Sequence, residues 1–529
     1  MAVPPDLTAR ARAWIAADPD AATREEMQSL VDAQDIGALT ARFAGRLEFG
    51  TAGLRGPLGA GPSRMNVAVV RAASAGLARH LRDHDADGPV VVGFDHRRGS
   101  RTFARETAGV LAAAGIPVRL ATRHWPTPVT AYAVRDLGAV AGVMVTASHN
   151  PAPDNGYKVY DASGSQIIPP TDAEISAGID AAGPAVDIPS APDAAIVAPL
   201  GDEAITAYID MAAAIIPSGP RELRAVYTPI HGVGGDLFRA LWDRAGFGPP
   251  FVVGEQADPD ADFPTAPFPN PEEPGVLDLA LDLARRKRAD IVLANDPDAD
   301  RLAVAIPERD DWRVLTGDEI GALLGAHALA NSSGDDRVVA RSIVSSTWLD
   351  KIAAVAKVPA RVTLTGFKWI SRAGDADGRR LVFGYEEALG YAVTPRVRDK
   401  DGLTAALAMA DLAARGSVAD ALSDLARAHG LHATSQWSVR FTDAADAAAF
   451  TARLRAAPPT TLGPARVVRI VDYLGGADGL PPADLVAIEL DNDARVLVRP
   501  SGTEPKVKCY FEVVVDHEQR DQAAEQLAL

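Results

Sequence analysis

Short apolar runs recur along this 529-residue chain, and most of them end in a cluster of polar residues. Helical patterns separate many of these runs, which cover residues 89–94, 142–145, 224–228, 291–294, 337–341, 362–364 and 380–383. Continuous apolar runs are typical of strands that are buried on both faces of a parallel sheet. Because open α/β sheets place their chemistry beyond the carboxyl ends of the strands, we expect the site residues in the polar clusters.

The chain is longer than one hydrophobic core usually supports, so several domains are expected. A helical arm with two short helices is predicted at residues 1–45, and α/β domains at 46–199, 200–315 and 316–431. A Pro/Ala/Asp-rich linker at 188–199 closes the first of these domains. The strands of residues 432–529 alternate between polar and apolar residues, which favours a smaller α+β domain with one solvated face. The predicted architecture is therefore three successive α/β domains with mainly parallel mixed sheets and a C-terminal α+β domain, around a central cleft.

Composition excludes several classes of protein. The formal net charge of −17 argues against a general affinity for nucleic acid or an anionic membrane surface. Cys509 is the only cysteine, so neither an intrachain disulfide nor a Cys-based zinc site is possible. The first residues lack the apolar core of a signal peptide, and no run of about 18 apolar residues could span a membrane. We expect a cytoplasmic protein without nucleic-acid or membrane partners.

Residues 146–151, Thr-Ala-Ser-His-Asn-Pro, follow the apolar run 142–145 and place Ser148 at a strand end. A serine hydroxyl is a poor nucleophile unless a neighbour takes its proton. His149 and Lys158 are the nearest residues that could do so or could neutralise an anion beside it. A polar turn without chemistry is the alternative interpretation.

A glycine-rich segment at residues 49–56 precedes the first domain's strands. Its glycines allow tight turns and close backbone approach, and Arg55 supplies a fixed cation. A turn with an exposed arginine is the alternative.

Asp296, Asp298 and Asp300 alternate directly after the apolar run 291–294. In an extended or turning backbone, their carboxylates can point to one side and converge on a cation. Oxygen ligands of this kind suit Mg²⁺. An EF-hand is rejected because Arg301 and Pro307 stand where that loop needs Gly and Glu. A solvated acidic turn remains the alternative.

One loop near the C-terminus gathers cations and hydroxyls, and its residues have the composition of a phosphate cradle. These residues are Arg499, Ser501, Gly502, Thr503 and Lys506. The absence of a Gly-x-x-x-x-Gly-Lys-Ser/Thr motif argues against a P-loop kinase or NTPase. Ser148 lacks a Gly-x-Ser-x-Gly context, which would support a hydrolase. A surface turn is the alternative for the cationic loop.

Glu386 and Glu387 form a carboxylate pair among uncharged neighbours, with Lys368 and Trp369 a short way upstream. Carboxylates accept hydrogen bonds from sugar hydroxyls. A capping or salt-bridging pair is the alternative.

Taken in order, these motifs resemble those of the α-D-phosphohexomutase superfamily, the phosphoglucomutases and phosphomannomutases. They look most like the branch with phosphopentomutase-type and glucose-1,6-bisphosphate-related enzymes. The resemblance runs from about residue 49 to residue 510. It implies that Ser148 is the phosphorylated residue, that residues 296–301 form the metal loop, and that residues 499–506 bind phosphate. Residues 366–370 and 386–391 correspond to the sugar-recognition segments.

The resemblance implies a Mg²⁺-dependent phosphosugar mutase that interconverts a sugar 1-phosphate and 6-phosphate through a phosphoserine. Glucose is the first expected sugar and mannose the second. A sugar 1,6-bisphosphate is the intermediate and activator, and the protein is expected to be a monomer or a small homo-oligomer. The implied roles are catalysis by Ser148, His149, Lys158, Arg55 and Arg301; metal binding by Ser148, Asp296, Asp298 and Asp300; and sugar binding by Thr51, Lys368, Trp369, Glu386 and Glu387.

One position departs from the family pattern. Leu389 stands two residues after Glu387, where many members have a serine. The loss of that hydroxyl leaves open a phosphopentomutase, acting on ribose or deoxyribose 1-phosphate, or a sugar-1,6-bisphosphate synthase. Two alternatives come from other classes, a non-catalytic phosphosugar-binding protein and a metal-dependent phosphatase that uses the same aspartates.

Overall fold

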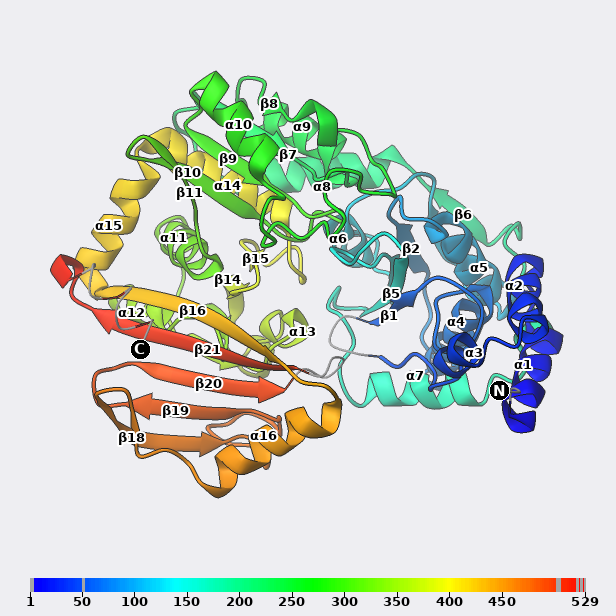
Figure 1. Cartoon of the computed structure of the whole chain (residues 1–529). Coiled ribbons are helices and arrows are strands. Elements are labelled where there is room, and N and C mark those ends of the chain that lie inside the picture. Colours follow the sequence, from blue (N-terminus) through cyan, green and yellow to red (C-terminus); the bar gives the residue numbers. More distant parts are fainter. Residues whose placement is uncertain (1–3, 50–52, 501–505, 520–522, 524–526, 528–529) are drawn as a thin grey trace. The chain divides into compact units, whose positions relative to one another are not determined.

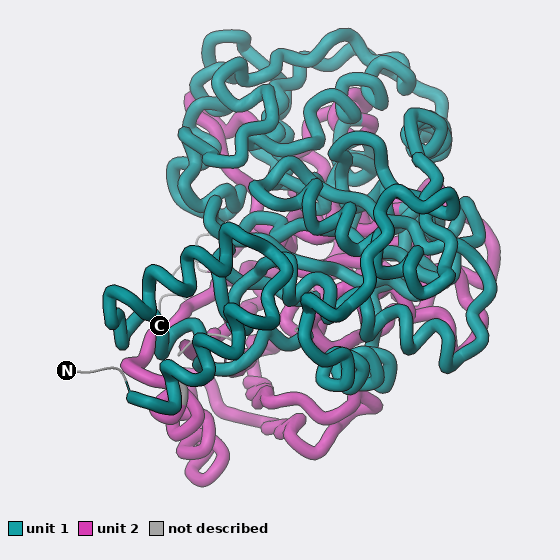
Figure 2. The backbone as a smooth tube through the Cα atoms, turned by 90° about the vertical axis from the view of Figure 1, so that its right-hand side faces the viewer, with its two compact units in different colours: residues 1–305, 394–410 teal, residues 306–393, 411–529 magenta. Residues whose placement is uncertain are grey.

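The computed structural model describes residues 4–49, 53–500, 506–519, 523 and 527 (Figure 1). These residues form two compact units (Figure 2). The first unit contains residues 1–305 and 394–410, and the second contains residues 306–393 and 411–529. Each unit contains α/β sheets, and each is described separately below.

The N-terminal arm has three helices rather than the predicted two: α1 (Pro5–Ala17), α2 (Ala21–Asp32) and α3 (Ile36–Arg42). The extra helix begins because Asp35 accepts a hydrogen bond from the Ala38 amide at 2.9 Å. An Asp at the N-cap satisfies an amide that has no partner within the helix. Sequence periodicity alone did not reveal this short third helix.

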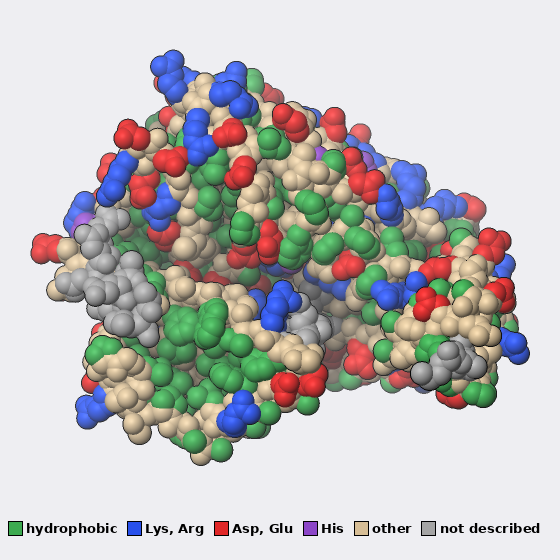
Figure 3. Space-filling view, viewed as in Figure 1, with side chains coloured by type: hydrophobic (Ala, Val, Ile, Leu, Met, Phe, Trp, Pro, Cys, Tyr) green, Lys and Arg blue, Asp and Glu red, His purple; other side chains and the backbone are tan. Residues whose placement is uncertain are grey.

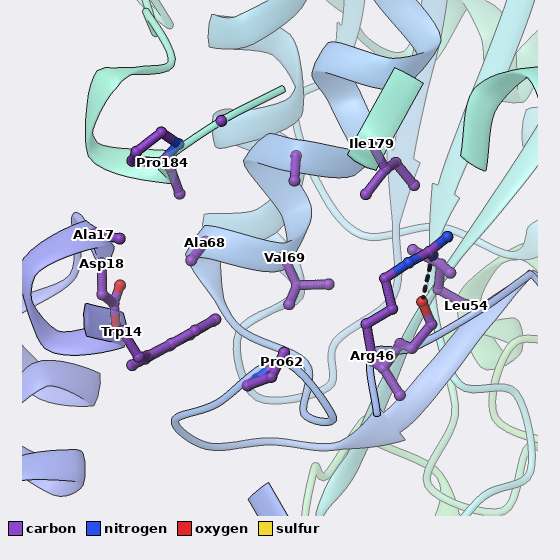
Figure 4. Close-up of a pocket in the computed structure, with 14 residues that line it drawn as sticks. Trp14, Ala17, Asp18, Arg46, Leu54, Pro62, Ala68, Val69, Ile179 and Pro184 are labelled. Carbon is purple, nitrogen blue, oxygen red and sulfur yellow. Dashed lines mark hydrogen bonds between the residues drawn. The ribbon is translucent and has the colours of Figure 1, made fainter. Parts of the chain in front are cut away.

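The arm packs onto the first α/β domain, and the two together line an open pocket of about 200 Å³ (Figure 4). Trp14 of α1 lies on one side of this pocket and Arg46 on the other. Nε of Arg46 lies 2.9 Å from Asp180 Oδ1, which ties the end of the arm to the last helix of the domain. The arm is therefore part of the first unit's packing.

The first sheet has the order β1-β5-β4-β2-β3-β6. Strands β4, β2, β3 and β6 are parallel to one another, whereas β5 runs antiparallel to both β4 and β1. Strand β6 arises from the end of the predicted linker, so that segment is an edge strand rather than a linker throughout. The elements are β1 (Leu54–Pro57), α4 (Val67–Asp83), β2 (Val90–Phe94), α5 (Ser100–Ala113), β3 (Val118–Ala121), α6 (Thr127–Asp136), β4 (Ala141–Val145), β5 (Asp154–Asp161), α7 (Thr171–Asp180), η1 (Ala185–Asp187) and β6 (Val197–Leu200).

The second sheet has the order β11-β10-β9-β7-β8. Strand β7 pairs in parallel with β8 and β9, and β10 pairs antiparallel with β9. The Pro-rich segment 259–274 contains neither helix nor strand, as predicted. The elements are α8 (Asp202–Ala213), β7 (Ala225–Thr228), α9 (Gly234–Arg244), β8 (Phe251–Val252), η2 (Gly254–Gln256), α10 (Asp278–Lys287), β9 (Ile291–Ala294), β10 (Ala303–Glu308) and β11 (Asp311–Val314).

The third sheet, in the second unit, has the order β13-β12-β14-β15, with parallel pairing of β12 to β13 and β14. Helix α11 begins with a capping box, in which Thr316 and Glu319 satisfy each other's backbone amides. The elements of this stretch of the chain are α11 (Gly317–Ala330), β12 (Arg337–Ser342), α12 (Trp348–Val355), β13 (Ala360–Thr363), α13 (Phe367–Ile370), η3 (Asp375–Asp377), β14 (Arg380–Glu386), β15 (Gly390–Ala392), α14 (Gly402–Arg415) and α15 (Val418–His429). Most of α14 belongs to the first unit.

The C-terminal sheet is antiparallel, in the order β16-β21-β20-β19-β18-β17. Figure 3 shows hydrophobic side chains gathered over this domain, and its exposed residues include Trp437, Val468, Ile470 and Leu474. The elements are β16 (Leu431–Arg440), α16 (Ala444–Ala456), β17 (Thr461–Leu462), β18 (Ala465–Asp472), β19 (Val486–Leu490), β20 (Arg495–Pro500), β21 (Lys506–Val515) and η4 (His517–Gln519).

Mixed α/β sheets followed by an antiparallel α+β domain confirm the predicted fold class. In the described part of the chain, no helix combines the length and the apolar composition that a membrane crossing requires.

Candidate active site

Ser148 lies just beyond the end of β4 and is almost fully buried, with 1% of its surface exposed. Its φ of +54° lies in the left-handed region, which non-glycine residues adopt rarely and often at functional sites. The hydroxyl donates a hydrogen bond to Asp296 Oδ2 at 2.8 Å, and His149 Nδ1 lies 3.2 Å from Ser148 Oγ. The structure therefore brings Ser148 directly against the first aspartate of the acidic loop.

Arg97 holds the Ser148 loop in place. Its guanidinium donates to the backbone carbonyls of Ser148 at 2.6 Å and Asn150 at 2.5 Å. It also donates to the carbonyls of Pro151 and Asp154, at 2.9 and 3.1 Å. One side chain from the end of β2 thus satisfies four carbonyl groups of the turn that exposes the Ser148 hydroxyl to Asp296.

The acidic loop follows β9 and buries all three carboxylates completely. One carboxylate oxygen of each of Asp296, Asp298 and Asp300 lies within 4.8 Å of the other two. Ala299 at φ +54° makes the turn between them, and the Arg301 amide donates to Asp296 Oδ1 at 2.9 Å. Oδ1 of Asp298 and Oδ1 of Asp300 are buried without a hydrogen-bond partner among the described residues. Buried carboxylate oxygens need compensation, so this set of donors fits a hard divalent cation such as Mg²⁺.

Lys158 is placed by β5, whose antiparallel pairing with β4 sets Lys158 opposite Met144. Its buried ammonium donates to Asp298 Oδ2 and Asp300 Oδ2, both at 2.8 Å. Burial alone would lower the pKa of Lys158, but the two carboxylates outweigh it and raise the pKa. In this arrangement Lys158 is a charge partner of the acidic loop.

The three aspartates differ in charge environment. Burial raises the pKa of Asp296 well above its usual value, and the neighbouring carboxylates raise it further. Burial also acts to raise the pKa of Asp300, but Lys158, Lys400 and Arg301 overcome this effect and lower it. Asp298 also has a lowered pKa despite its burial, since Lys158 and the Thr127 hydroxyl stabilise the carboxylate. The loop can thus keep carboxylates ionised in a closed environment.

His149 and Arg55 also lie at this site. Burial lowers the pKa of His149 well below its usual value, and the positive charges of Arg301 and Arg55 lower it further. Arg55, in β1, donates to Asn150 Oδ1 at 3.3 Å. Burial lowers the pKa of Arg55, and this effect outweighs the opposing effect of the Asp298 and Asp300 carboxylates. The Arg301 guanidinium lies 3.5 Å from Glu272.

The second unit contains the predicted sugar-recognition residues. Glu386, at the end of β14, accepts a hydrogen bond from the Gly366 amide at 2.6 Å. Glu387 accepts from the hydroxyls of Ser342 and Ser345, each at 3.2 Å. The Lys368 ammonium lies over the ring of Trp369, 5.9 Å from the ring centroid. Leu389 is buried, and its backbone has a positive φ of +62°. The two glutamates are therefore fixed by neighbours of the same unit.

Two residues of the predicted phosphate loop, Arg499 and Lys506, are among the described residues. Arg499 and Lys506 belong to the two strands on either side of the loop, and the last pair of the ladder is Pro500 with Val507. Arg440 lies opposite Lys506 in β16 and adds a third cation at the same end of the sheet. The predicted site residues Thr51, Ser501, Gly502 and Thr503 lie outside the described residues.

Sequence reasoning missed several residues that contact the Ser148 and acidic loops. The Thr127 hydroxyl donates to Asp298 Oδ2 at 2.6 Å, and Lys400 Nζ lies 3.3 Å from Asp300 Oδ2. Arg97, which contacts the Ser148 loop, was also missed, and so was Ser342, which contacts Glu387 in the second unit. Each lies in or beside a polar cluster that follows an apolar run, the signal used for Ser148. Lys400 gave no such signal, since it precedes a helix and follows no strand.

Models of the phosphoglucomutase/phosphomannomutase family match the chain in four successive segments. α/β/α domain I matches residues 46–185, domain II residues 206–309, domain III residues 316–429 and the C-terminal domain residues 438–529. The chain belongs to the phosphoglucomutase/phosphomannomutase family.

Relatives within this family have different names. A probable phosphomannomutase of Haemophilus influenzae is 41% identical over 460 residues, covering 85% of this chain and 93% of the relative. A phosphopentomutase of Mus musculus is 35% identical over 561 residues, covering 94% of this chain and 89% of the relative. A glucose 1,6-bisphosphate synthase of Mus musculus is 34% identical over 573 residues, covering 98% of this chain and 91% of the relative.

Membership of the phosphoglucomutase/phosphomannomutase family makes this chain a phosphosugar mutase, an isomerase that works by phosphoryl transfer. The two mutases differ in the sugar that their names give, and the third relative is named as a synthase of a sugar bisphosphate.

Proposed function

We propose that Ser148 carries the phosphoryl group of this mutase and that Asp296, Asp298 and Asp300 hold Mg²⁺ beside it. The observation that carries the proposal is the 2.8 Å hydrogen bond from the Ser148 hydroxyl to Asp296, at the edge of a fully buried carboxylate cluster. A serine in this place is close to ligands for a cation and to the charge-balancing Lys158.

In the proposed reaction, the bond between phosphorus and Ser148 Oγ breaks as the oxygen of a sugar hydroxyl forms a new bond to the phosphorus. The sugar hydroxyl gives up its proton, and Ser148 Oγ takes up a proton to become the free hydroxyl. The product is a sugar bisphosphate, which turns over and returns its other phosphoryl group to Ser148 Oγ. In that return step the Ser148 hydroxyl loses its proton, and Asp296 Oδ2 and His149 Nδ1 are the acceptors that face it, at 2.8 and 3.2 Å. Arg97 keeps the loop in the conformation that makes this attack possible.

Mg²⁺ bound by the three aspartates would neutralise negative charge on the phosphoryl oxygens. Chelation of divalent ions should lower the rate by at least about 10²-fold, since the loss of one such electrostatic contact typically costs that much. Asp300→Asn should raise the Mg²⁺ concentration needed for half-maximal rate, because the amide has lost the charge that attracts the cation.

The control for this prediction is Asp262→Asn, since Asp262 is exposed and outside the acidic cluster. Rates and thermal melts are measured with and without Mg²⁺. Full activity in excess chelator, or an unchanged Mg²⁺ requirement in Asp300→Asn, would contradict the metal assignment.

We further propose that the substrate is a hexose phosphate, interconverted between its 1-phosphate and 6-phosphate, with glucose first and mannose second. The 41% identical phosphomannomutase supports a hexose. Glu386 and Glu387, at the end of β14 and just after it, can accept hydrogen bonds from sugar hydroxyls. A pentose phosphate is the second candidate, favoured by the 35% identical phosphopentomutase and by Leu389, which offers no hydroxyl.

A panel of glucose, mannose, glucosamine, ribose and deoxyribose 1-phosphates, each with its bisphosphate primer, tests the substrate. We expect kcat/KM for glucose 1-phosphate to exceed that for the pentose phosphates by at least about tenfold, since buried groups left unpaired penalise the wrong sugar. A preference for ribose 1-phosphate would replace the hexose by the second candidate. Accumulation of the bisphosphate would indicate a synthase, and release of inorganic phosphate from the 1-phosphate alone would indicate a phosphatase.

A further inference from the structure

Two histidines and a glutamate converge on the helical side of the first domain. His80 lies in the last turn of α4, His84 follows that helix as its C-cap, and Glu174 lies in the first turn of α7. One ligand atom from each residue lies within 4.8 Å of the other two. None of the contacts described above for the Ser148 loop or the acidic loop involves these three residues. The mutase chemistry therefore does not account for them.

The distances within this cluster match those between ligands of one small ion. His80 Nδ1 and His84 Nε2 lie 3.0 and 3.6 Å from the same oxygen, Glu174 Oε2. Two ligands of a tetrahedral zinc ion, each at about 2.0–2.1 Å from the metal, are separated by roughly 3.3–3.5 Å. The two observed distances lie on either side of this value, and the two histidine nitrogens lie within 4.8 Å of each other.

The hydrogen bonding of His84 leaves its other nitrogen available. His84 Nδ1 lies 2.9 Å from the His80 carbonyl oxygen, which can only accept a hydrogen bond. Nδ1 must therefore carry the proton, and in the neutral ring Nε2 has a free lone pair that faces the Glu174 carboxylate. A backbone carbonyl that fixes the tautomer in this way is common for metal-binding histidines.

The backbone holds the two helices in a fixed relation. A Cβ atom added at Gly178 of α7 would lie 2.8 Å from the Cα atom of Gly76 in α4, so the helices touch without intervening side chains. His80 lies one turn beyond Gly76, and Glu174 lies one turn before Gly178. The close contact of α4 and α7 (Figure 1) thus places the three side chains together on rigid elements.

We propose that His80, His84 and Glu174 form a second metal site, which binds a zinc-type divalent transition ion and clamps α4 to α7. Two imidazole nitrogens and one carboxylate oxygen suit Zn²⁺ rather than Mg²⁺, which prefers oxygen ligands. Glu174 and His84 have 41% and 55% of their side-chain surface exposed, so water can complete the coordination and the ion can enter from solvent. The site stabilises the fold and takes no part in phosphoryl transfer.

Calorimetric titration of the full chain with Zn²⁺, in excess Mg²⁺ to occupy the acidic loop, tests this site. Wild-type protein should bind one more equivalent of Zn²⁺ than His84→Ala or Glu174→Gln, or bind it at least about tenfold more tightly. His429→Ala is the matched control, since His429 belongs to no cluster of potential metal ligands in the part of the chain that the structure describes. It should titrate like wild type.

Thermal melting gives an independent readout. Zn²⁺ should raise the melting temperature of wild type and His429→Ala but not of His84→Ala or Glu174→Gln, because an ion bound only by the folded state stabilises it. All three variants should retain the mutase rate in Mg²⁺. Equal Zn²⁺ binding in wild type and Glu174→Gln, or an equal shift in melting temperature, would overturn the proposal. Such a result would leave the Ser148 assignment untouched.

Discussion

Ser148→Ala should lower the mutase rate by at least roughly 10⁴-fold, since removal of a nucleophile that forms a covalent intermediate leaves only binding and electrostatic contributions. The fold should persist because alanine removes only the hydroxyl, whose partners Asp296 and His149 retain other neighbours. Circular dichroism and the melting temperature check the fold, and a coupled assay with sugar 1-phosphate and bisphosphate measures the rate.

Ser165→Ala provides a matched control for this prediction. Ser165 is also fully buried, and its hydroxyl has no hydrogen-bond partner among the described residues. Loss of that hydroxyl should leave both the rate and the melting temperature close to those of wild type. A Ser148→Ala enzyme that retained more than a few per cent of the wild-type rate would show that another residue carries the phosphoryl group.

Arg97→Met should have the second largest effect and should change both stability and rate. Methionine leaves the carbonyls of Ser148, Asn150, Pro151 and Asp154 without the guanidinium that they contact. Breaking a buried charged network of this kind costs about 3–5 kcal/mol. For a domain of this size, that loss lowers the melting temperature by roughly 6–20 °C.

The positioning role of Arg97 is tested by kinetics below the melting transition. We expect kcat to fall by about 10²-fold while KM changes little, because a small displacement of the reacting group is enough to lose that factor. Arg98→Met is the control, since the neighbouring Arg98 is exposed and its one ion pair among the described residues is with exposed Asp262. An exposed pair contributes about 0–1 kcal/mol, so this variant should resemble wild type. A folded Arg97→Met enzyme with wild-type kcat would contradict the positioning role and leave Arg97 with a structural role alone.

The apolar runs of the sequence were sufficient to predict the strands that lead to the site. The run 142–145 became β4 and the run 291–294 became β9, each with its polar cluster at the strand end. Because a strand end fixes the start of the following loop, Ser148 and Asp296 could be identified as candidates before their contact was known. The acidic loop also had a chemical signature of its own, three carboxylates in alternation.

The remaining contacts depend on pairings that periodicity does not encode. Lys158 reaches Asp298 because β5 runs antiparallel to β4, and a single sequence does not show which strands will pair. Lys400 reaches Asp300 because residues 394–410 return to the first unit after the chain has formed the third sheet. The arm's third helix depended on one capping side chain, Asp35, rather than on a long apolar pattern.

The identity of the phosphorylated residue is tested most directly by mass spectrometry of the protein after incubation with a sugar 1,6-bisphosphate and Mg²⁺. We predict a mass increase of about 80 Da, the mass of one phosphoryl group, located in the peptide that contains Ser148. The increase should disappear on chase with sugar 1-phosphate and should not form in Ser148→Ala. An unmodified protein, or a phosphoryl group on any other residue, would contradict the account.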